Sequence, residues 1–227
     1  MSTAAVFVIG DEILHGEIED QNGPWLIRQL SDRGIDVRRL SVLPDEPDVI
    51  ADELIRFEDC DYRLTTGGLG PTHDGRTLEA VGQALDRPLV TDDRLVDILE
   101  EEHGTLNEAQ RNMALRPEGG EFIHLEDSVG IGFQVEDIYV FPGFPELLQP
   151  LFFQLENEFE GEPLTTRTLE TSGWESDIAG LLEDFQEDYS DLEFGSYPHT
   201  DGSITIKIRG RDPDQIDRAF DQLDAEV

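Results

Sequence analysis

A glycine-rich stretch at residues 64–77 constrains the fold of this chain more than any other part of its sequence. It begins with the apolar to β-branched run of residues 64–66 and continues through glycines at positions 67, 68, 70 and 75. Apolar residues at helical spacing follow over residues 77–85. This order predicts a strand, a loop (residues 67–75, the glycine loop) and a helix. Such a loop directs backbone N–H groups and the positive end of a helix dipole at one spot, which suits phosphate.

Strands and helices are predicted to alternate through the first 160 residues. The continuous apolar run of residues 3–9 is typical of a buried central strand. Further strands are predicted at residues 35–42, 62–66, 121–124 and 138–141, and helices at 22–33, 47–57, 77–85, 92–102, 108–114 and 145–157. The alternation indicates an α/β domain with a parallel sheet covered on both faces. Ligands of such sheets bind beyond the carboxyl ends of the strands.

The pattern changes near residues 159–163, and a second, smaller domain is predicted there. Its order is strand, helix, strand, strand, helix, over residues 164–170, 176–188, 193–197, 203–209 and 213–225. One tight hairpin at Asp201-Gly202 favours a small α+β domain with a mixed sheet. The predicted division is therefore residues 1–162 and 163–227.

The chain is strongly acidic, with 52 Asp and Glu against 16 Lys and Arg, for a formal charge of −36. The acidic residues alternate with apolar positions in both halves, so they are expected to coat folded surfaces. Affinity for nucleic acid or anionic membranes depends on clustered basic residues, so neither is expected as a partner. No leader-like segment follows Met1 and no stretch is long enough to span a bilayer, so a cytoplasmic protein is expected.

Stability is expected to depend on salt, because self-repulsion of this size destabilises a compact state at low ionic strength, as in halophilic proteins. The melting temperature should rise between low and molar KCl. Thermal unfolding followed by circular dichroism at the two salt concentrations checks this. An unchanged melting temperature would contradict it.

The glycine loop differs from two commoner phosphate-binding signatures. A dinucleotide fingerprint needs a third glycine, which is missing after Gly68-Leu69-Gly70. A P-loop needs lysine where Arg76 stands, and Pro71 removes a backbone N–H. A simple tight turn is the structural alternative, but four glycines in nine positions cost backbone entropy that a turn does not require. We therefore favour ligand binding, and expect Gly68→Val to abolish it by filling the space that the phosphate needs.

Four carboxylates, Asp11, Glu12, Asp45 and Asp74, follow predicted strands or lie in strand-to-helix loops, so they could converge beside the glycine loop. Carboxylates next to a phosphate site are typical of Mg²⁺ binding. In a chain with 52 acidic residues, the alternative is that they are solvated surface groups. Arg76, at the start of the helix, is predicted either to clamp a phosphate or to pair with nearby acidic residues.

These residues together resemble the competence/damage-inducible protein A (CinA) family and its wider superfamily of MoaB/Mog-type molybdopterin-binding domains. The resemblance rests on residues 10–16 and 20–22, Asp45, residues 66–74, Thr77, Glu79-Ala80 and residues 142–146. The second domain, with residues 173–176 before a helix, is similar to the KH-like domain of CinA proteins. With the acidic composition, the resemblance implies a haloarchaeal member of the family with a MoaB/Mog-like α/β/α sandwich.

The resemblance implies binding of a phosphate-bearing pterin or nucleotide. One implied chemistry is Mg²⁺-dependent hydrolysis of a pyrophosphate such as ADP-ribose; the other is molybdenum cofactor assembly with molybdopterin as ligand. Gly75 replaces the second aspartate usual in the family, which favours a third reading, a non-catalytic binding protein. A homo-oligomer is also implied. The implied catalytic residues are Asp74 and Asp45, the metal ligands Asp74 and Asp11, and the ligand-binding residues Gly10, Asp11, Glu12, Thr66, Gly67, Gly68, Gly70, Thr72, Arg76, Pro142 and Gly143.

Overall fold

The computed structural model describes residues 2–70, 75–125 and 130–227. The chain forms two compact units, Met1–Gly161 and Glu162–Val227, which are described separately below. The division lies one residue before the predicted one. No helix among the described residues combines the length and the apolar character needed to cross a membrane.

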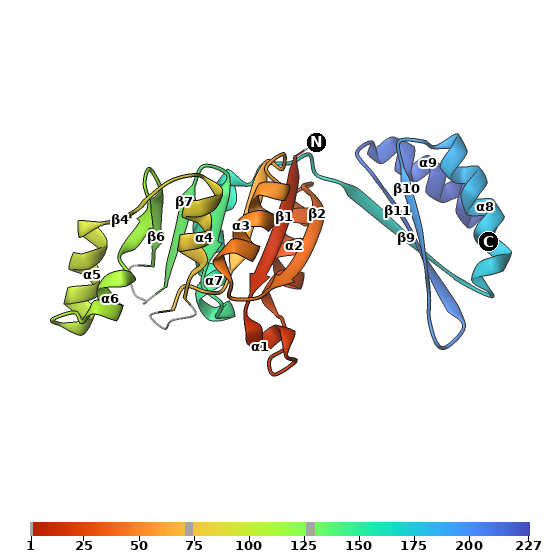
Figure 1. Cartoon of the computed structure of the whole chain (residues 1–227). Helices are drawn as coiled ribbons and strands as arrows, with labels where there is room; N and C mark the ends of the chain where they lie inside the picture. Colours follow the sequence, from red (N-terminus) through yellow and green to blue (C-terminus); the bar gives the residue numbers. More distant parts are fainter. Residues whose placement is uncertain (1, 71–74, 126–129) are drawn as a thin grey trace. The chain divides into compact units, whose positions relative to one another are not determined.

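The first unit is built on a six-stranded sheet with the strand order β2-β1-β3-β8-β7-β6 (Figure 1). Four strands run parallel to one another: β2 (Asp36–Leu43), β1 (Thr3–Ile9), β3 (Tyr62–Thr66) and β8 (Ile138–Phe141). Two antiparallel strands, β7 (Ile131–Val135) and β6 (Glu121–His124), extend the sheet at one edge. All seven residues of β1 are buried, as predicted for a central strand.

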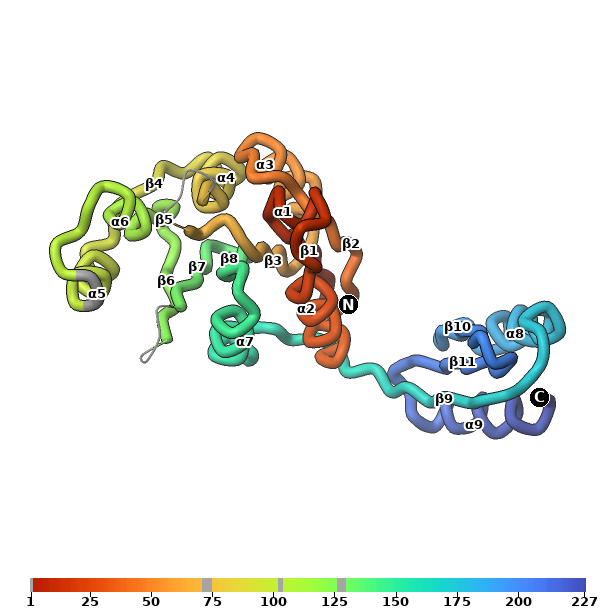
Figure 2. Tube along the Cα trace, turned by 90° about the horizontal axis from the view of Figure 1, so that it is seen from below, coloured from red at the N-terminus to blue at the C-terminus, as the bar shows by residue number. Residues whose placement is uncertain are grey.

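Helices cover both faces of this sheet (Figure 2). Helices α2 (Asn22–Asp32) and α7 (Pro145–Gln154) lie on one face, and α3 (Pro47–Arg56) and α4 (Thr77–Ala84) on the other. Alternate residues of β1 serve the two layers, with Phe7 and Ile9 in one core and Ala4 and Val6 in the other. The predicted α/β/α sandwich is confirmed; the sheet, predicted to be parallel, is mostly so, with β7 and β6 antiparallel.

Several short elements complete the first unit. Helix α1 (Asp11–Leu14) follows β1, and a 3₁₀ turn (Glu156–Glu158) follows α7, which ends three residues before the predicted limit. A separate two-stranded ribbon, β4 (Leu89–Thr91) and β5 (Leu115–Pro117), flanks α5 (Asp93–His103) and α6 (Glu108–Asn112). Strands β4, β5 and β7 were not predicted from the sequence.

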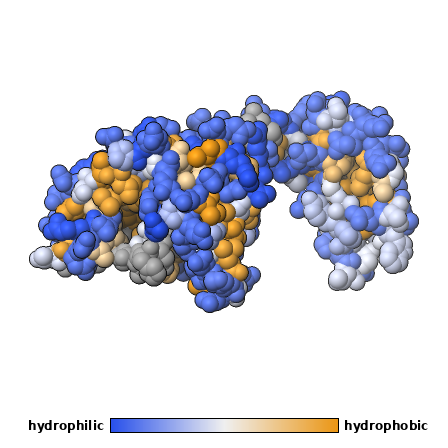
Figure 3. All heavy atoms as spheres, viewed as in Figure 1, coloured by the Kyte–Doolittle hydropathy of each residue, from blue (hydrophilic) through white to orange (hydrophobic). Residues whose placement is uncertain are grey.

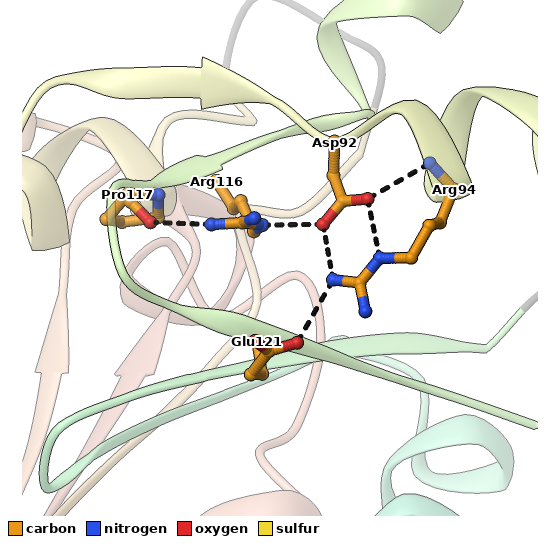
Figure 4. Close-up of polar contacts among 5 residues, drawn as sticks. All are labelled: Asp92, Arg94, Arg116, Pro117 and Glu121. Atoms are coloured by element: carbon orange, nitrogen blue, oxygen red, sulfur yellow. Dashed lines mark hydrogen bonds and ion pairs between the residues drawn. The ribbon is translucent and has the colours of Figure 1, made fainter.

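An ion-pair network centred on the buried Asp92 carboxylate connects α5 to the strands beside it (Figure 4). The Asp92 carboxylate caps α5 and is 4% exposed. It accepts hydrogen bonds from Arg94 Nη2 and Arg116 Nε, both at 2.7 Å. Arg94 Nη2 also donates to Glu121 Oε2 of β6 at 3.0 Å. These contacts link the α5–α6 segment to the ribbon and to the edge of the central sheet.

The second unit is a three-stranded sheet with two helices. Its elements are β9 (Thr165–Ser172), α8 (Glu175–Asp188), β10 (Glu193–Pro198), β11 (Ser203–Gly210) and α9 (Pro213–Asp224), in the predicted order. The predicted mixed sheet is wrong, because β11 lies between β10 and β9 and runs antiparallel to both. Isoleucines 204, 206 and 208 of β11 form the core with residues of both helices, including Phe185 and Leu223.

Candidate functional site

A cavity of about 740 Å³ opens at the carboxyl ends of the four parallel strands. Each strand leads into a segment of its wall: Gly10 and Glu12 after β1, Asp45 after β2, the glycine loop after β3, and Pro142-Gly143 after β8. The cavity is thereby lined by nine of the predicted site residues: Gly10, Glu12, Asp45, Thr66, Gly67, Gly68, Gly70, Pro142 and Gly143. Two others, Thr72 and Asp74, lie outside the described residues.

A hydrogen-bond network joins the end of β3 and the Pro142-Gly143 segment to the start of α2. The Thr66 hydroxyl, 1% exposed, donates to the Pro142 carbonyl at 2.9 Å and accepts from Asn22 Nδ2 at 3.0 Å. Asn22 Nδ2 also donates to the Gly143 carbonyl at 2.7 Å. The Thr66 hydroxyl therefore positions the wall of the cavity, with its donor already used within the protein. Asn22 was not among the predicted site residues, although it lies in a segment that carries the family resemblance.

Two glycines of the loop are required by the protein's own packing. Gly67 and Gly68 have positive φ angles of 102° and 65°. A Cβ on Gly67 would lie 2.1 Å from the Ile9 carbonyl oxygen, and one on Gly68 would lie 2.1 Å from Thr77 Oγ1. Gly68→Val was predicted to abolish ligand binding by filling the space that the phosphate needs. That reason is wrong, because the space beside Gly68 is occupied by the Thr77 side chain.

Some backbone donors of the loop are already paired. The Gly67 N–H donates to the Phe141 carbonyl at 3.0 Å and continues the sheet. By contrast, the N–H groups of Gly68, Leu69 and Gly70 donate to none of the residues that the structure describes. Fewer backbone N–H groups are therefore left to bind an anion than the sequence suggested, and the first of them is that of Gly68.

The charge of the cavity is negative. Glu12, Glu19, Asp20 and Asp45 line it, and its described lining contains no arginine, lysine or histidine. Asp45 Oδ2 accepts a hydrogen bond from the Asp11 backbone N–H at 3.0 Å, whereas the exposed Asp11 is not part of the described lining. Over residues 2–70, 75–125 and 130–227, no three His, Cys, Asp or Glu side chains form a group that could hold a metal ion.

Arg76 pairs with an acidic neighbour, which is one of the two alternatives predicted for it. Its Nε and Nη2 donate to the two carboxylate oxygens of Glu79 at 2.9 and 2.8 Å. It lines an adjoining cavity of about 280 Å³ and not the larger one. Arg76 therefore does not offset the negative charge of the main cavity.

The sequence analysis did not identify the apolar part of the wall. Met113 follows α6, and Ile131 and Phe133 come from β7; the polar Gln110 of α6 also lines the cavity. Ile18, Phe144 and Leu147 also line the cavity. Phe144 directly follows a predicted site residue, and its position after Pro142-Gly143 is the one sequence signal that could have identified it.

Comparison with known proteins places both units. Residues 5–158 match the family described as "Probable molybdopterin binding domain", and residues 163–227 match "FAD synthase, middle domain". The second match does not confirm the KH-like resemblance. A protein of Archaeoglobus fulgidus is 30% identical over 220 residues, which cover 96% of this chain and 95% of that protein.

Two further relatives carry the competence-related names. A Clostridium botulinum protein named "Putative competence-damage inducible protein" is 30% identical over 225 residues, 92% of this chain and 54% of that protein, so this chain spans about half of its length. The crystal structure of CinA from Thermoplasma acidophilum, described as of unknown function, is 26% identical, with a TM-score of 0.65. That alignment covers 70% of this chain and 99% of the other. The chain therefore belongs to the family described as "Probable molybdopterin binding domain", with CinA-like proteins among its relatives.

Proposed function

We propose that the first unit binds a phosphate-bearing pterin or nucleotide in the 740 Å³ cavity. The observation that carries the proposal is the placement of the cavity. It lies beyond the carboxyl ends of parallel strands, where sheets of this type bind ligands, and beside the amides of residues 68–70. Its volume is within the range of small-molecule sites, roughly 300–1,000 Å³.

We propose that Mg²⁺ accompanies the ligand, because a cavity lined by four carboxylates repels a phosphate unless a cation offsets the charge. The donor set fits this ion: Mg²⁺ is usually held by one or two carboxylates together with substrate phosphates and water. Glu12 and Asp45 are the candidate ligands, in place of the predicted Asp11. When bound, Mg²⁺ would neutralise phosphate charge and lower the pKa of a bound water. Asp74 stays a predicted ligand and catalytic group outside the described residues.

Within this binding role, we propose hydrolysis of a pyrophosphate such as ADP-ribose. Water would add to one phosphorus atom, the bridging P–O bond would break, and AMP and ribose 5-phosphate would leave. Asp45 would hold a fixed orientation at the reacting phosphates, because the Asp11 backbone N–H donates to its Oδ2 atom. Molybdenum cofactor assembly, with molybdopterin as ligand, is the alternative that the family name supports.

A binding role without turnover is favoured by Gly75. A Cβ at this position would lie 1.9 Å from the Gly70 carbonyl oxygen, so residues 70 and 75 approach this closely only with glycine at position 75. The family's usual aspartate could not occupy this position without a change in the loop. With glycine in place of this aspartate, the cavity has one carboxylate fewer that could help to activate water.

Turnover is tested by incubating the protein with Mg²⁺ and ADP-ribose in molar KCl and measuring AMP by chromatography. FAD is a second probe, because it contains a pyrophosphate and the second unit matches a domain named for FAD synthase. We expect Asp45→Asn to reduce turnover by roughly 10- to 100-fold, the effect of losing a group that orients a metal or its ligands. Asp11→Asn is the matched control, since it keeps the backbone N–H that Asp45 accepts.

The possible outcomes distinguish hydrolysis, binding without turnover and the absence of ligand binding. Binding measured by calorimetry without AMP release would support the non-catalytic role. Equal turnover in the wild type and in Asp45→Asn would remove Asp45 from the mechanism. Absence of binding by ADP-ribose, FAD and molybdopterin alike would overturn the proposed function.

A further inference from the structure

Phe144 exposes an unusually large apolar surface at the cavity. Its side chain is 70% exposed, and Ile18 is 56% exposed. Among the large apolar side chains that the structure describes in the first unit, these two are the most exposed, and both line the 740 Å³ cavity. Single exposed apolar residues are common on protein surfaces, but their coincidence with one concave site indicates a binding surface. Most of the face shown in Figure 3 is hydrophilic, and apolar side chains gather around α1, which follows β1 beside the cavity.

The backbone around Phe144 is firmly held. Phe144 precedes the first turn of α7, and its carbonyl accepts hydrogen bonds from the N–H groups of Leu147 and Leu148 at 3.0 and 2.9 Å. Pro145 fixes the first helical position. On the other side, the Gly143 carbonyl is held by Asn22. The aromatic ring is therefore presented by a rigid segment, which limits the entropy lost when a ligand binds against it.

Phe144 also lies at a suitable distance from the glycine loop. A Cβ on Gly143 would be 3.5 Å from the Gly67 Cα. One Cα–Cβ bond and one Cα–Cα step then place the Phe144 Cα within about 9 Å of the Gly67 Cα. This upper limit allows one nucleotide to place its ring at Phe144 and its phosphate at residues 68–70. A single ligand could contact both.

We propose that Phe144 stacks on the planar heterocycle of the ligand whose phosphate is held at residues 68–70, and that this contact selects ring-bearing phosphate compounds over simple sugar phosphates. The inference rests on the proposed function and specifies its substrate class. Stacking is a suitable source of affinity here, because the described lining offers no basic side chain to attract a phosphate alone. Stacking of a base on an aromatic side chain accounts for roughly 10- to 100-fold in affinity.

Calorimetry in molar KCl with Mg²⁺ tests the proposal with two probes, ADP-ribose, which carries an adenine ring and a diphosphate, and ribose 5-phosphate, which carries one phosphate and no heterocycle. We expect Phe144→Ala to weaken ADP-ribose binding by about 10- to 100-fold and ribose 5-phosphate binding by less than about 2-fold. Phe144→Trp should restore ADP-ribose binding. Phe153→Ala is the matched control, because Phe153 is also in the α7 segment and 47% exposed but is not part of the described lining.

Each outcome decides between the two proposals. Unchanged ADP-ribose affinity in Phe144→Ala, or equal losses for both probes, would overturn the stacking while leaving the proposed function in place. If the wild type binds neither probe, stacking on the adenine ring is overturned, whereas the proposed function fails only if FAD and molybdopterin are not bound either. If Phe144→Ala instead lowers the mass measured by light scattering and leaves ADP-ribose affinity unchanged, Phe144 is a subunit contact and the stacking is overturned.

Discussion

The Gly67→Ala variant is expected to lose about 2–5 kcal/mol in the free energy of unfolding, from steric overlap and from the positive φ angle together. An added Cβ would lie 2.1 Å from the Ile9 carbonyl oxygen, a backbone atom of the central strand that cannot move aside. The φ of 102° is also one that side-chain-bearing residues rarely adopt. For a chain of this size the melting temperature should fall by about 5–15 °C.

Gly143→Ala is the control for this prediction. It belongs to the same cavity wall, but its Cβ would lie 3.5 Å from the nearest atom, which is an ordinary contact. Thermal and urea unfolding in molar KCl compare the two variants with the wild type. If Gly67→Ala were as stable as Gly143→Ala, the loop would not be packed against β1 in the way described.

The glycine loop shows where sequence reasoning succeeded and where it could not. The order of strand, loop and helix was predicted correctly, because apolar spacing and glycine content determine these features locally. What each glycine does depends on neighbours distant in sequence. Gly67 faces Ile9 and Gly68 faces Thr77, and no local pattern reveals which atoms lie there. The same holds for Asn22, whose amide joins Thr66 and Gly143 across 44 and 121 residues.

The gathering of segments around the cavity could be predicted for a physical reason. Parallel strands place their carboxyl ends at one edge, so the residues after β1, β2, β3 and β8 meet once these strands are identified. The part of the wall formed by Ile131 and Phe133 could not be predicted, because β7 was not recognised from the sequence. This strand has only five residues and contains Gly132, which ordinarily argues against a strand. In the structure, a Cβ at Gly132 would come within 3.0 Å of the Val140 carbonyl oxygen.

The acidic composition limited the prediction of individual carboxylates. Among 52 acidic residues, sequence position alone does not separate a cavity-lining carboxylate from a solvated one. Glu19 and Asp20 line the cavity but were not among the predicted site residues. Asp11 was predicted as a metal ligand, and it contributes its backbone N–H, which donates to Asp45. Halophilic character, haloarchaeal origin, cytoplasmic location and self-association stay predictions for experiment.

The Asp92→Ala variant is expected to lose about 2–3 kcal/mol in the free energy of unfolding, because a buried carboxylate that accepts charged hydrogen bonds is removed while its partner Arg94 stays largely solvated. The Asp92 carboxylate caps α5 through the Arg94 N–H and accepts from both the Arg94 and Arg116 guanidinium groups. Without it, the Arg116 side chain, 17% exposed, would keep its charge without the carboxylate that it contacts. Asp93→Ala is the matched control, since the neighbouring Asp93 is exposed.

The contribution of Asp92 to the free energy of unfolding should also depend on pH, and the direction follows from the lowered pKa of its carboxyl. Hydrogen bonds from the Arg94 guanidinium, and then from Arg116, hold the pKa of the Asp92 carboxyl well below its usual range although burial acts to raise it. A depressed pKa stabilises the folded state above the unfolded value of about 3.9, and this contribution is lost as the pH falls through the folded value. In urea unfolding at molar KCl, the stability difference between wild type and Asp92→Asn should therefore be constant from about pH 5 to 7 and shrink below about pH 4. A difference that stayed constant into the acid range would mean that Asp92 acts as a neutral helix cap and that its charge contributes nothing to holding α5 in place.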